Sequence, residues 1–148
     1  MSEQLFPVFD VPEIDTQSQE DSRPYKPSVY FDFEKGDFRL DSAYRITIAT
    51  GQEAYIQWCR KVVETEGDAC LAYSTDIGIE GETALSELDG AAVESAIEKT
   101  ITEALMVNVH TEYVKNFQFL WTADELHMSF IVKGKEWEEV TISTDFLT

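Results

Sequence analysis

Carboxylates are the residues of this sequence best suited to chemistry, because Asp and Glu occupy 29 of 148 positions against 11 for Lys and Arg. Glycoside hydrolysis needs only an acid and a second carboxylate held a few ångströms apart, so a peptidoglycan hydrolase is one alternative function. Among so many acids, however, some pair always has a suitable spacing. The acids near the middle of the chain are better explained as a solvated rim than as a catalytic pair. They are Glu64, Glu66, Asp68, Asp76 and Glu80.

Other kinds of catalysis lack the residues that they need. His110 and His127 are isolated in the sequence, and no calcium-loop pattern is present. Glycine motifs that cradle phosphates and a Gly-flanked serine nucleophile are also missing. Cys59 and Cys70 have neither the number nor the spacing of a disulfide framework or zinc site, so we expect two reduced, mostly buried thiols. The sequence predicts no catalytic, cofactor-binding or metal-binding residues and no cofactor.

The formal net charge of -18 limits the kinds of partner that this protein can bind. Nucleic-acid affinity depends on Lys and Arg side chains that displace counterions from phosphates, so we expect no nucleic-acid partner. An acidic mimic of DNA that blocks a host enzyme is a second alternative function. No apolar run approaches the roughly 20 residues that cross a bilayer, and the acidic start of the chain does not resemble a signal peptide. We therefore expect a cytoplasmic protein without a membrane partner.

A helix, a short corner and two strands between Leu85 and Val132 are the elements that must position any functional residue. The apolar stripe of the helix repeats at steps of four, and charged residues fall opposite it. This stripe consists of Val93, Ile97, Ile101 and Leu105. After the corner, apolar and polar residues alternate over 113–121 and 126–132, which is strand periodicity. The helix is therefore expected to pack on a sheet that contains both strands.

Weaker patterns on either side complete the predicted fold. Short strands are expected at 29–33, 38–40, 45–49 and 69–73, a helix with a wide apolar stripe after Gly51, and a last strand from Val140. Trp58 and Trp121 fall on apolar faces, whereas Trp137 stands in an acidic stretch and is expected to be an exposed contact. The sequence predicts an α+β fold in which two main helices pack on a small, mostly antiparallel sheet, preceded by an extended N-terminal arm.

The first 27 residues differ from the rest in composition. Pro7 and Pro12 interrupt an apolar cluster, which therefore suits neither a helix nor a central strand and is expected to form an extended arm. An alternative is that the arm packs as an edge segment on its own domain. From Glu13 to Pro27 the chain is polar and acidic, as in a linker. We divide the chain into the arm with its linker, residues 1–27, and a single α+β domain, residues 28–148. The apolar residues of the arm are Leu5, Phe6, Val8, Phe9 and Val11.

Four segments of this sequence, taken in their order along the chain, resemble a known family. They are LFPVFDVPE at the start, YKPSVYFDFEKGDFRLD, ETEGDACLAYSTDIGIE, and the helix end TITEAL followed by a corner and a strand. Together they resemble the small baseplate wedge proteins, or sheath initiators, of contractile phage tails. They are most similar to the branch found in Gram-positive myophages, PBSX-like defective prophages and phage-tail bacteriocins. The family has been called lysozyme-like, but no motif for that activity is present here.

The resemblance implies a structural, non-enzymatic subunit of a virion tail baseplate, assembled in the host bacterial cytoplasm. It implies three kinds of partner: a larger baseplate wedge protein, the tail sheath protein, and other inner baseplate or hub subunits. Such a subunit is present in multiple copies in a symmetric baseplate and is expected to be a monomer when free. Members of the family bind the wedge through a helix and corner, and their sheet edge offers strands to the first sheath ring by strand addition.

The resemblance assigns each of these contacts to particular residues. The corner that docks to the wedge corresponds to Asn108, Val109 and His110, where the family usually carries an acidic residue, Pro and Arg in succession. A His in place of the Arg supplies a weaker and pH-dependent contact. The arm residues from Leu5 to Val11 are expected to tether another baseplate subunit. The strands expected to face the sheath contribute Leu126, Met128, Phe130, Val140 and Ile142.

Overall fold

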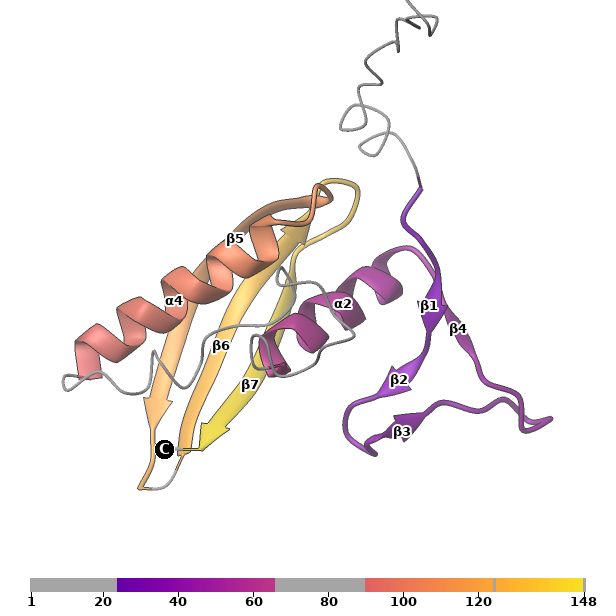
Figure 1. The fold of residues 1–148 in the computed structure, drawn as a ribbon, viewed down its shortest axis with the longest axis horizontal. Helices are drawn as coiled ribbons and strands as arrows, with labels where there is room; N and C mark the ends of the chain where they lie inside the picture. The colour runs from indigo at the N-terminus through magenta and orange to yellow at the C-terminus, as the bar shows by residue number, and fades with distance from the viewer. Residues whose placement is uncertain (1–23, 66–89, 124, 148) are drawn as a thin grey trace, which may run out of the picture.

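The computed structural model describes residues 24–65, 90–123 and 125–147. Within them, two helices lie on one face of a three-stranded antiparallel sheet, and a small β-hairpin unit projects from the start of one helix (Figure 1). The two helices and the antiparallel sheets confirm the predicted α+β fold. The N-terminal arm and the strand predicted at 69–73 lie outside the described residues.

The central unit runs from α4 (Gly90–Met106) through a tight corner into three strands. These are β5 (Thr111–Trp121), β6 (Glu125–Gly134) and β7 (Val140–Leu147). They form an antiparallel meander in the order β5-β6-β7, so β6 has a strand partner on both sides. The helix, the corner and the two following strands therefore occur where their periodicity predicts them.

Alternation along β6 builds the core of the protein. Every second side chain of this strand is buried and the others are half-exposed, and α4 covers the buried ones with its apolar stripe. Phe117 of β5 stacks on Phe130 with the ring centroids 5.2 Å apart, which extends the core under the neighbouring strand. The buried core residues of these elements are Val93, Ile97, Ile101, Leu105, Leu126, Met128, Phe130, Val132 and Ile142.

Helix α2 (Gln52–Glu64) completes the core beside α4 and against β7. It begins after Gly51, whose φ of 55° is a conformation that glycine adopts readily. Its wide apolar stripe faces the core, and most of the predicted residues are buried, while Ile56 and Trp58 are half-buried. The buried ones are Ala54, Tyr55, Cys59, Val62 and Val63. Burial raises the pKa of the Cys59 thiol to about 12, so this thiol is a neutral core group. Cys70 lies outside the described residues.

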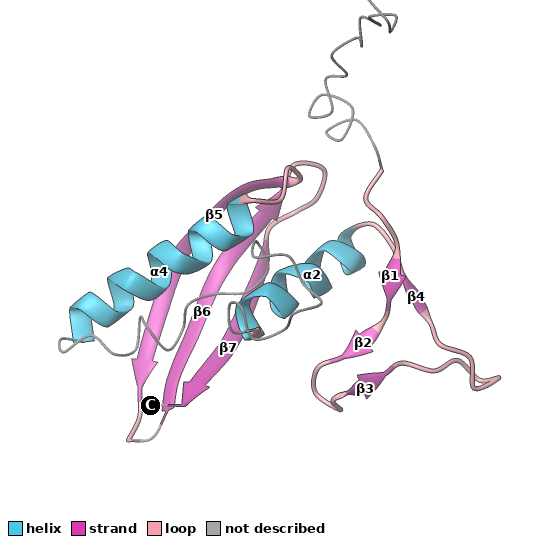
Figure 2. Ribbon diagram, in the orientation of Figure 1, coloured by secondary structure: helices cyan, strands magenta, loops and turns pink. Residues whose placement is uncertain are grey.

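Residues 28–49 form a separate hairpin unit instead of joining the main sheet (Figure 2). Strand β1 (Ser28–Val29) pairs with β4 (Ile48–Ala49), and β2 (Phe31–Asp32) pairs with β3 (Asp37–Phe38), both antiparallel. Strands therefore form in each region predicted here, but each has only two residues, and the one predicted at 29–33 is divided into β1 and β2. They pair only with one another among the described residues. Their local alternation is the same whether or not they join the main sheet, so the sequence pattern does not distinguish the two arrangements.

Three backbone hydrogen bonds hold the hairpin unit together at its centre. The Tyr30 N–H donates to the Thr47 carbonyl, the Thr47 N–H to the Arg39 carbonyl, and the Arg39 N–H to the Tyr30 carbonyl. Gln57 of α2 anchors the unit to the domain, because its side chain accepts a hydrogen bond from the Phe31 N–H and donates one to the Val29 carbonyl.

Two tryptophans differ from the sequence expectation. Trp137 is not an exposed contact, because the turn after β6 folds its ring back to within 5.1 Å of the Tyr55 ring, centroid to centroid. Trp121 is 42% exposed at the far end of β5, where its indole Nε1 donates to Glu94 of α4. Trp58 packs against the core, as its place on the apolar stripe indicates.

Candidate docking surfaces

The corner between α4 and β5 is built around Asn108. Its Oδ1 accepts a hydrogen bond from the His110 N–H at 3.0 Å, and its carbonyl accepts one from the Thr111 N–H at 2.9 Å. Its Nδ2 donates to the Tyr25 hydroxyl at 3.4 Å. Asn suits this position because its side chain can bond the backbone two residues further on. The predicted docking corner is therefore held in one conformation by its own first residue.

An aromatic cluster packs under the corner. The Tyr25 ring meets the rings of His110, Trp137 and Tyr55 edge-on, with centroid distances of 5.1, 5.6 and 5.8 Å. Burial raises the pKa of the Tyr25 hydroxyl to about 12. The Tyr55 hydroxyl shares a hydrogen bond of 2.9 Å with the Thr111 hydroxyl inside the core. His110 is thus a packed ring at the edge of the domain, and Tyr25, which precedes the predicted domain boundary, contacts the domain.

The outward surface of the corner is apolar. Met106, Val107 and Val109 are 46%, 55% and 38% exposed, whereas Asn108 and His110 are half-buried. Met106 and Val107 are not among the residues that the sequence predicts for the docking corner, although both are exposed. The sequence does contain a sign of their exposure: both are apolar, but they follow Leu105, the last residue of the buried four-residue repeat. Contiguous exposed apolar residues of this kind mark partner surfaces.

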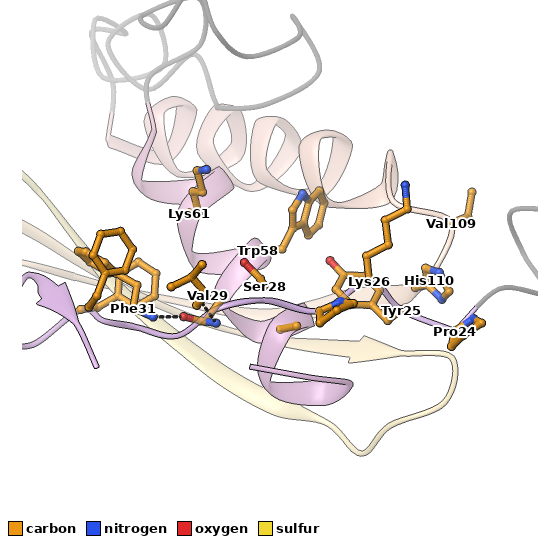
Figure 3. A pocket seen from close by; sticks show the side chains of 15 residues that line it. Pro24, Tyr25, Lys26, Ser28, Val29, Phe31, Trp58, Lys61, Val109 and His110 are labelled. Atoms are coloured by element: carbon orange, nitrogen blue, oxygen red, sulfur yellow. Dashed lines mark hydrogen bonds between the residues drawn. The ribbon is translucent and has the colours of Figure 1, made fainter. Parts of the chain in front are cut away.

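A groove of about 760 Å³ opens between α2, the hairpin unit and the corner (Figure 3). We call it the corner groove. Its walls carry aromatic and aliphatic side chains from three separate parts of the chain, and Lys26 and Lys61 lie at its rim. The residues that form its walls include Tyr25, Val29, Phe31, Phe33, Phe38, Ala54, Trp58 and Val109.

The main sheet has two outer edges, on β5 and on β7, and neither has a further strand partner among the described residues. The register between β5 and β6 is broken twice, near Glu112 and near Asn116, where φ is 57°. The register between β7 and β6 is continuous from Val140 to Leu147. Bulges interrupt the row of main-chain groups that an added strand would pair with. The β7 edge is therefore the more regular of the two.

Most side chains predicted to face the sheath lie in the core of the chain. Leu126, Met128, Phe130 and Ile142 are buried, and Val140 is half-buried. Because β6 is the middle strand, its main-chain groups already pair with β5 and β7. A sheath contact in this region can therefore use the main chain of β7, but not the side chains of β6 that face inward.

The outer face of the sheet, opposite the helices, is polar and paired by charge. Glu139 accepts hydrogen bonds from the Tyr113 hydroxyl and the Lys115 ammonium, and Lys133 pairs with Glu112. The hydrogen bond between Glu139 and Lys115 raises the pKa of the lysine and lowers the pKa of the carboxyl. Lys115 and Lys133 on this face are thus each paired with a carboxylate from a neighbouring strand or turn.

Other predicted features give no binding site in the described part of the chain. His110 packs in the aromatic cluster and His127 lies on the outer face of the sheet, so the two histidines are apart. No group of three or more His, Cys, Asp or Glu is arranged for a metal ion in the described ranges.

Neither helix described has the length and hydropathy of a membrane span. The predicted arm contacts, Leu5, Phe6, Val8, Phe9 and Val11, lie outside the described residues.

Comparison with known protein families gives a match over most of the chain. A family model described as the contractile injection system sheath initiator matches residues 28–136, which include the hairpin unit, both helices, the corner, β5 and β6. No curated protein matches the chain. The match covers more than half of the chain and confirms the resemblance to sheath initiators, while the prophage, myophage or bacteriocin branch stays a prediction. This chain belongs to the contractile injection system sheath initiator family.

Proposed function

We propose that this protein starts a contractile sheath by offering the outer edge of β7 to the first incoming sheath strand. Membership of the sheath initiator family gives the chain a structural role in sheath assembly, contacts with sheath and baseplate components, and a place in the tail baseplate. The observation that supports the finer proposal is the continuous register of β7. An added strand would gain main-chain hydrogen bonds from such an edge.

The two edges differ in the features that discourage strand addition. Soluble proteins protect exposed edges with bulges, lysines and prolines. The β5 edge carries two register breaks and Lys115, whereas the β7 sequence VTISTDFL contains neither Lys nor Pro and pairs without a bulge. The unprotected edge is the one expected to be used.

Space beside the start of β7 supports the same edge. A second groove, of about 410 Å³, lies between Val140 and Thr141 on one side and residues of α2 and the hairpin unit on the others. Ile56 and Arg60 of α2 line it, as does Tyr30. An incoming segment that pairs with β7 would find an open approach at this end of the strand.

Lysines placed on the β7 edge test this proposal. Thr141→Lys/Ser143→Lys changes two exposed residues of β7 and adds the type of side chain that blocks edge pairing. Gln118→Lys/Leu120→Lys is the matched control, because it adds the same charges at exposed positions of β5. Electron microscopy of particles assembled with each variant should show baseplates without sheath for the β7 variant and sheathed tails for the β5 variant. Sheathed tails with the β7 variant would rule out this edge.

The corner is proposed as the contact with a larger baseplate wedge protein. Asn108 and His110 fix its shape, and Met106, Val107 and Val109 present the apolar surface. Burial of three such side chains stabilises a complex by a few kcal/mol at about 25 cal/mol per Å². His110, held edge-on to Tyr25, would contribute a weaker contact than the Arg usual in the family.

Acidic substitutions in the corner separate this contact from the sheath contact. Val107→Asp/Val109→Asp should leave the fold intact, because both side chains are exposed, and should abolish incorporation into the baseplate. Gln118→Asp/Leu120→Asp, again on β5, provides the control with the same change in charge. The measurement is co-purification with the wedge complex. Equal incorporation of both variants would refute docking through the corner.

The remaining assignments follow from the same role. We propose that the arm from Leu5 to Val11 tethers another inner baseplate or hub subunit, that the free chain is a monomer placed in multiple copies in the baseplate, and that assembly takes place in the bacterial cytoplasm. We propose no catalytic role. A turbidity assay on purified cell walls tests this, and clearing that depends on one pair of carboxylates would overturn it.

A further inference from the structure

The corner groove has an apolar floor and a basic rim on a strongly acidic chain. Among the described residues that line it, none is acidic, although the chain carries 29 acids. Lys26 and Lys61 lie at its rim, and the ring of His110 lies in one wall. Trp58 presents its ring to the groove from α2 (Figure 3). A ligand that fits this lining is an extended segment with apolar side chains and flanking carboxylates.

The first 23 residues of this chain have that composition. They contain six acids and one Arg, and their apolar cluster includes Phe6 and Phe9. Pro7 and Pro12 favour an extended backbone, the form that a groove accepts without displacing a helix. The charge of the segment is therefore opposite to that of the groove rim, and its apolar side chains match the groove floor.

The point of attachment places the segment next to the groove. The described chain begins at Pro24, which itself lines the corner groove, and Tyr25 is packed in its wall. Twelve residues separate Val11 from Pro24 and span up to roughly 40 Å when extended. Such a tether gives an effective concentration on the order of millimolar, so a contact that is weak between separate molecules is still occupied within one chain.

We propose that, in the free subunit, the segment Leu5–Val11 docks in the corner groove of its own chain. This docking is distinct from the proposed sheath and wedge contacts. It makes the groove a site that must be vacated when the arm tethers a baseplate partner, and it covers Val109 of the docking corner until then. The arm and the corner therefore become available to partners together.

Amide NMR spectra of the full-length protein test this docking directly. Phe6→Asp/Phe9→Asp removes the apolar contacts, so the resonances of the Trp58 indole and the Gln57 and Val109 amides should shift. The Trp121 indole lies at the far end of β5 and serves as an internal control that should not move. In the unaltered chain, amides of the arm should have shifts that differ from those of the same segment as a free peptide.

Charge reversal on the groove side gives the reciprocal test. Lys26→Glu/Lys61→Glu should move the amides of the arm to their free-peptide positions, because like charges then face one another. Lys35→Glu/Lys99→Glu makes the same change in net charge at exposed positions outside the groove and should leave the arm docked.

Three results would overturn the proposal. Groove resonances unchanged by Phe6→Asp/Phe9→Asp would show that the arm is not there. Shifts that grow with protein concentration, together with a dimer mass by light scattering, would assign the groove to the arm of a second copy. A groove that responds only to an added baseplate protein would assign it to that partner. All three are read on the isolated protein or a single addition, so they do not depend on whether β7 templates the sheath.

Discussion

His127 lies on the outer face of the sheet between two carboxylates. Its Nδ1 is 2.5 Å from Asp145 of β7, and its Nε2 is 3.5 Å from Glu125 of its own strand. The hydrogen bond with Asp145 is the main cause that raises the pKa of this histidine above its ordinary value of 6.5, and the charge of Glu125 adds to it. The protonated ring therefore joins β6 to the edge strand that we expect to receive the sheath.

Replacement of Asp145 should lower the pKa of His127. Because the folded-state pKa is raised, the stabilisation from the charged ring is complete below the unfolded pKa of about 6.5 and is lost as the pH rises through the folded-state value. An NMR titration of the ring should show a lower midpoint for Asp145→Asn than for the unaltered chain. Glu125→Gln is the control and should have the smaller effect, since this carboxylate is farther away. An unchanged midpoint in Asp145→Asn would contradict the assignment.

The buried hydroxyl pair of Tyr55 and Thr111 gives a second prediction about individual residues. Tyr55→Phe leaves the Thr111 hydroxyl, which is 4% exposed, without its partner, at a cost of about 1–3 kcal/mol in the free energy of unfolding. Thr111→Val likewise leaves the Tyr55 hydroxyl without its hydrogen-bond partner. The double variant removes both polar groups, so its loss should be smaller than the sum of the single losses by about 1 kcal/mol. Urea unfolding of the four proteins measures this, and strict additivity would show that the hydroxyls do not interact.

At the level of elements, the end of β6 depends on a residue without a side chain. A Cβ placed on Gly134 would lie 2.5 Å from Cε3 of Trp137 and 3.3 Å from Cε1 of Tyr55. The turn from β6 to β7 and the aromatic cluster under the corner are therefore packed against the same backbone position.

Gly134→Ala should destabilise the protein by about 1–3 kcal/mol, because the tryptophan ring must move out of its packed position. Gly90→Ala is the matched control: no atom lies within 4 Å of its added Cβ, and Ala is the better helix former, so stability should be equal or slightly higher. Denaturant midpoints compare the two variants. A Gly134→Ala protein as stable as Gly90→Ala would mean that the cluster is not tightly packed there.

Periodicity is sufficient to predict the helices and strands of this fold, but not which of them lie next to one another. The four-residue repeat from Val93 to Leu105 and the alternation around Phe130 gave α4 and β6 directly, because local burial imposes these periods. Strand order does not appear in such a pattern, since middle and edge strands alternate alike. For that reason the alternation alone does not show that Leu126 and Met128 belong to a middle strand, where they are buried in the core. Trp137 was misplaced because its packing depends on contacts distant in sequence.

Over the whole molecule, charge and exposed apolar side chains are unevenly distributed. The described segment 24–49 contains four basic and four acidic residues, whereas the complete chain has a net charge of -18. This segment also carries many of the exposed large apolar residues that are described: Val29, Phe38, Leu40, Tyr44, Ile46 and Ile48. A neutral, apolar projection is thus joined to an acidic, well-packed body.

Hydrogen exchange should reveal this division. Amides of β6 should exchange most slowly, because the strand is paired on both sides over a buried face. Amides near the bridge between Leu40 and Ile46 should exchange more than about tenfold faster, since few buried contacts hold them. Mass spectrometry of exchanged peptides gives both rates in one experiment. Equal protection of the two regions would mean that the hairpin unit unfolds only with the body.

The meander also governs what happens while the chain is being made. Among the described strands, β7 leaves the ribosome last, when α4, β5 and β6 have already been synthesised. Only residues 135–139 separate it from β6, and hairpins with such short connections close within about 1–10 μs. Once β7 is free to fold, the exposed edge of β6 is therefore covered by its own chain on this timescale. The β7 edge that we propose as the sheath template therefore exists only when the sheet is complete.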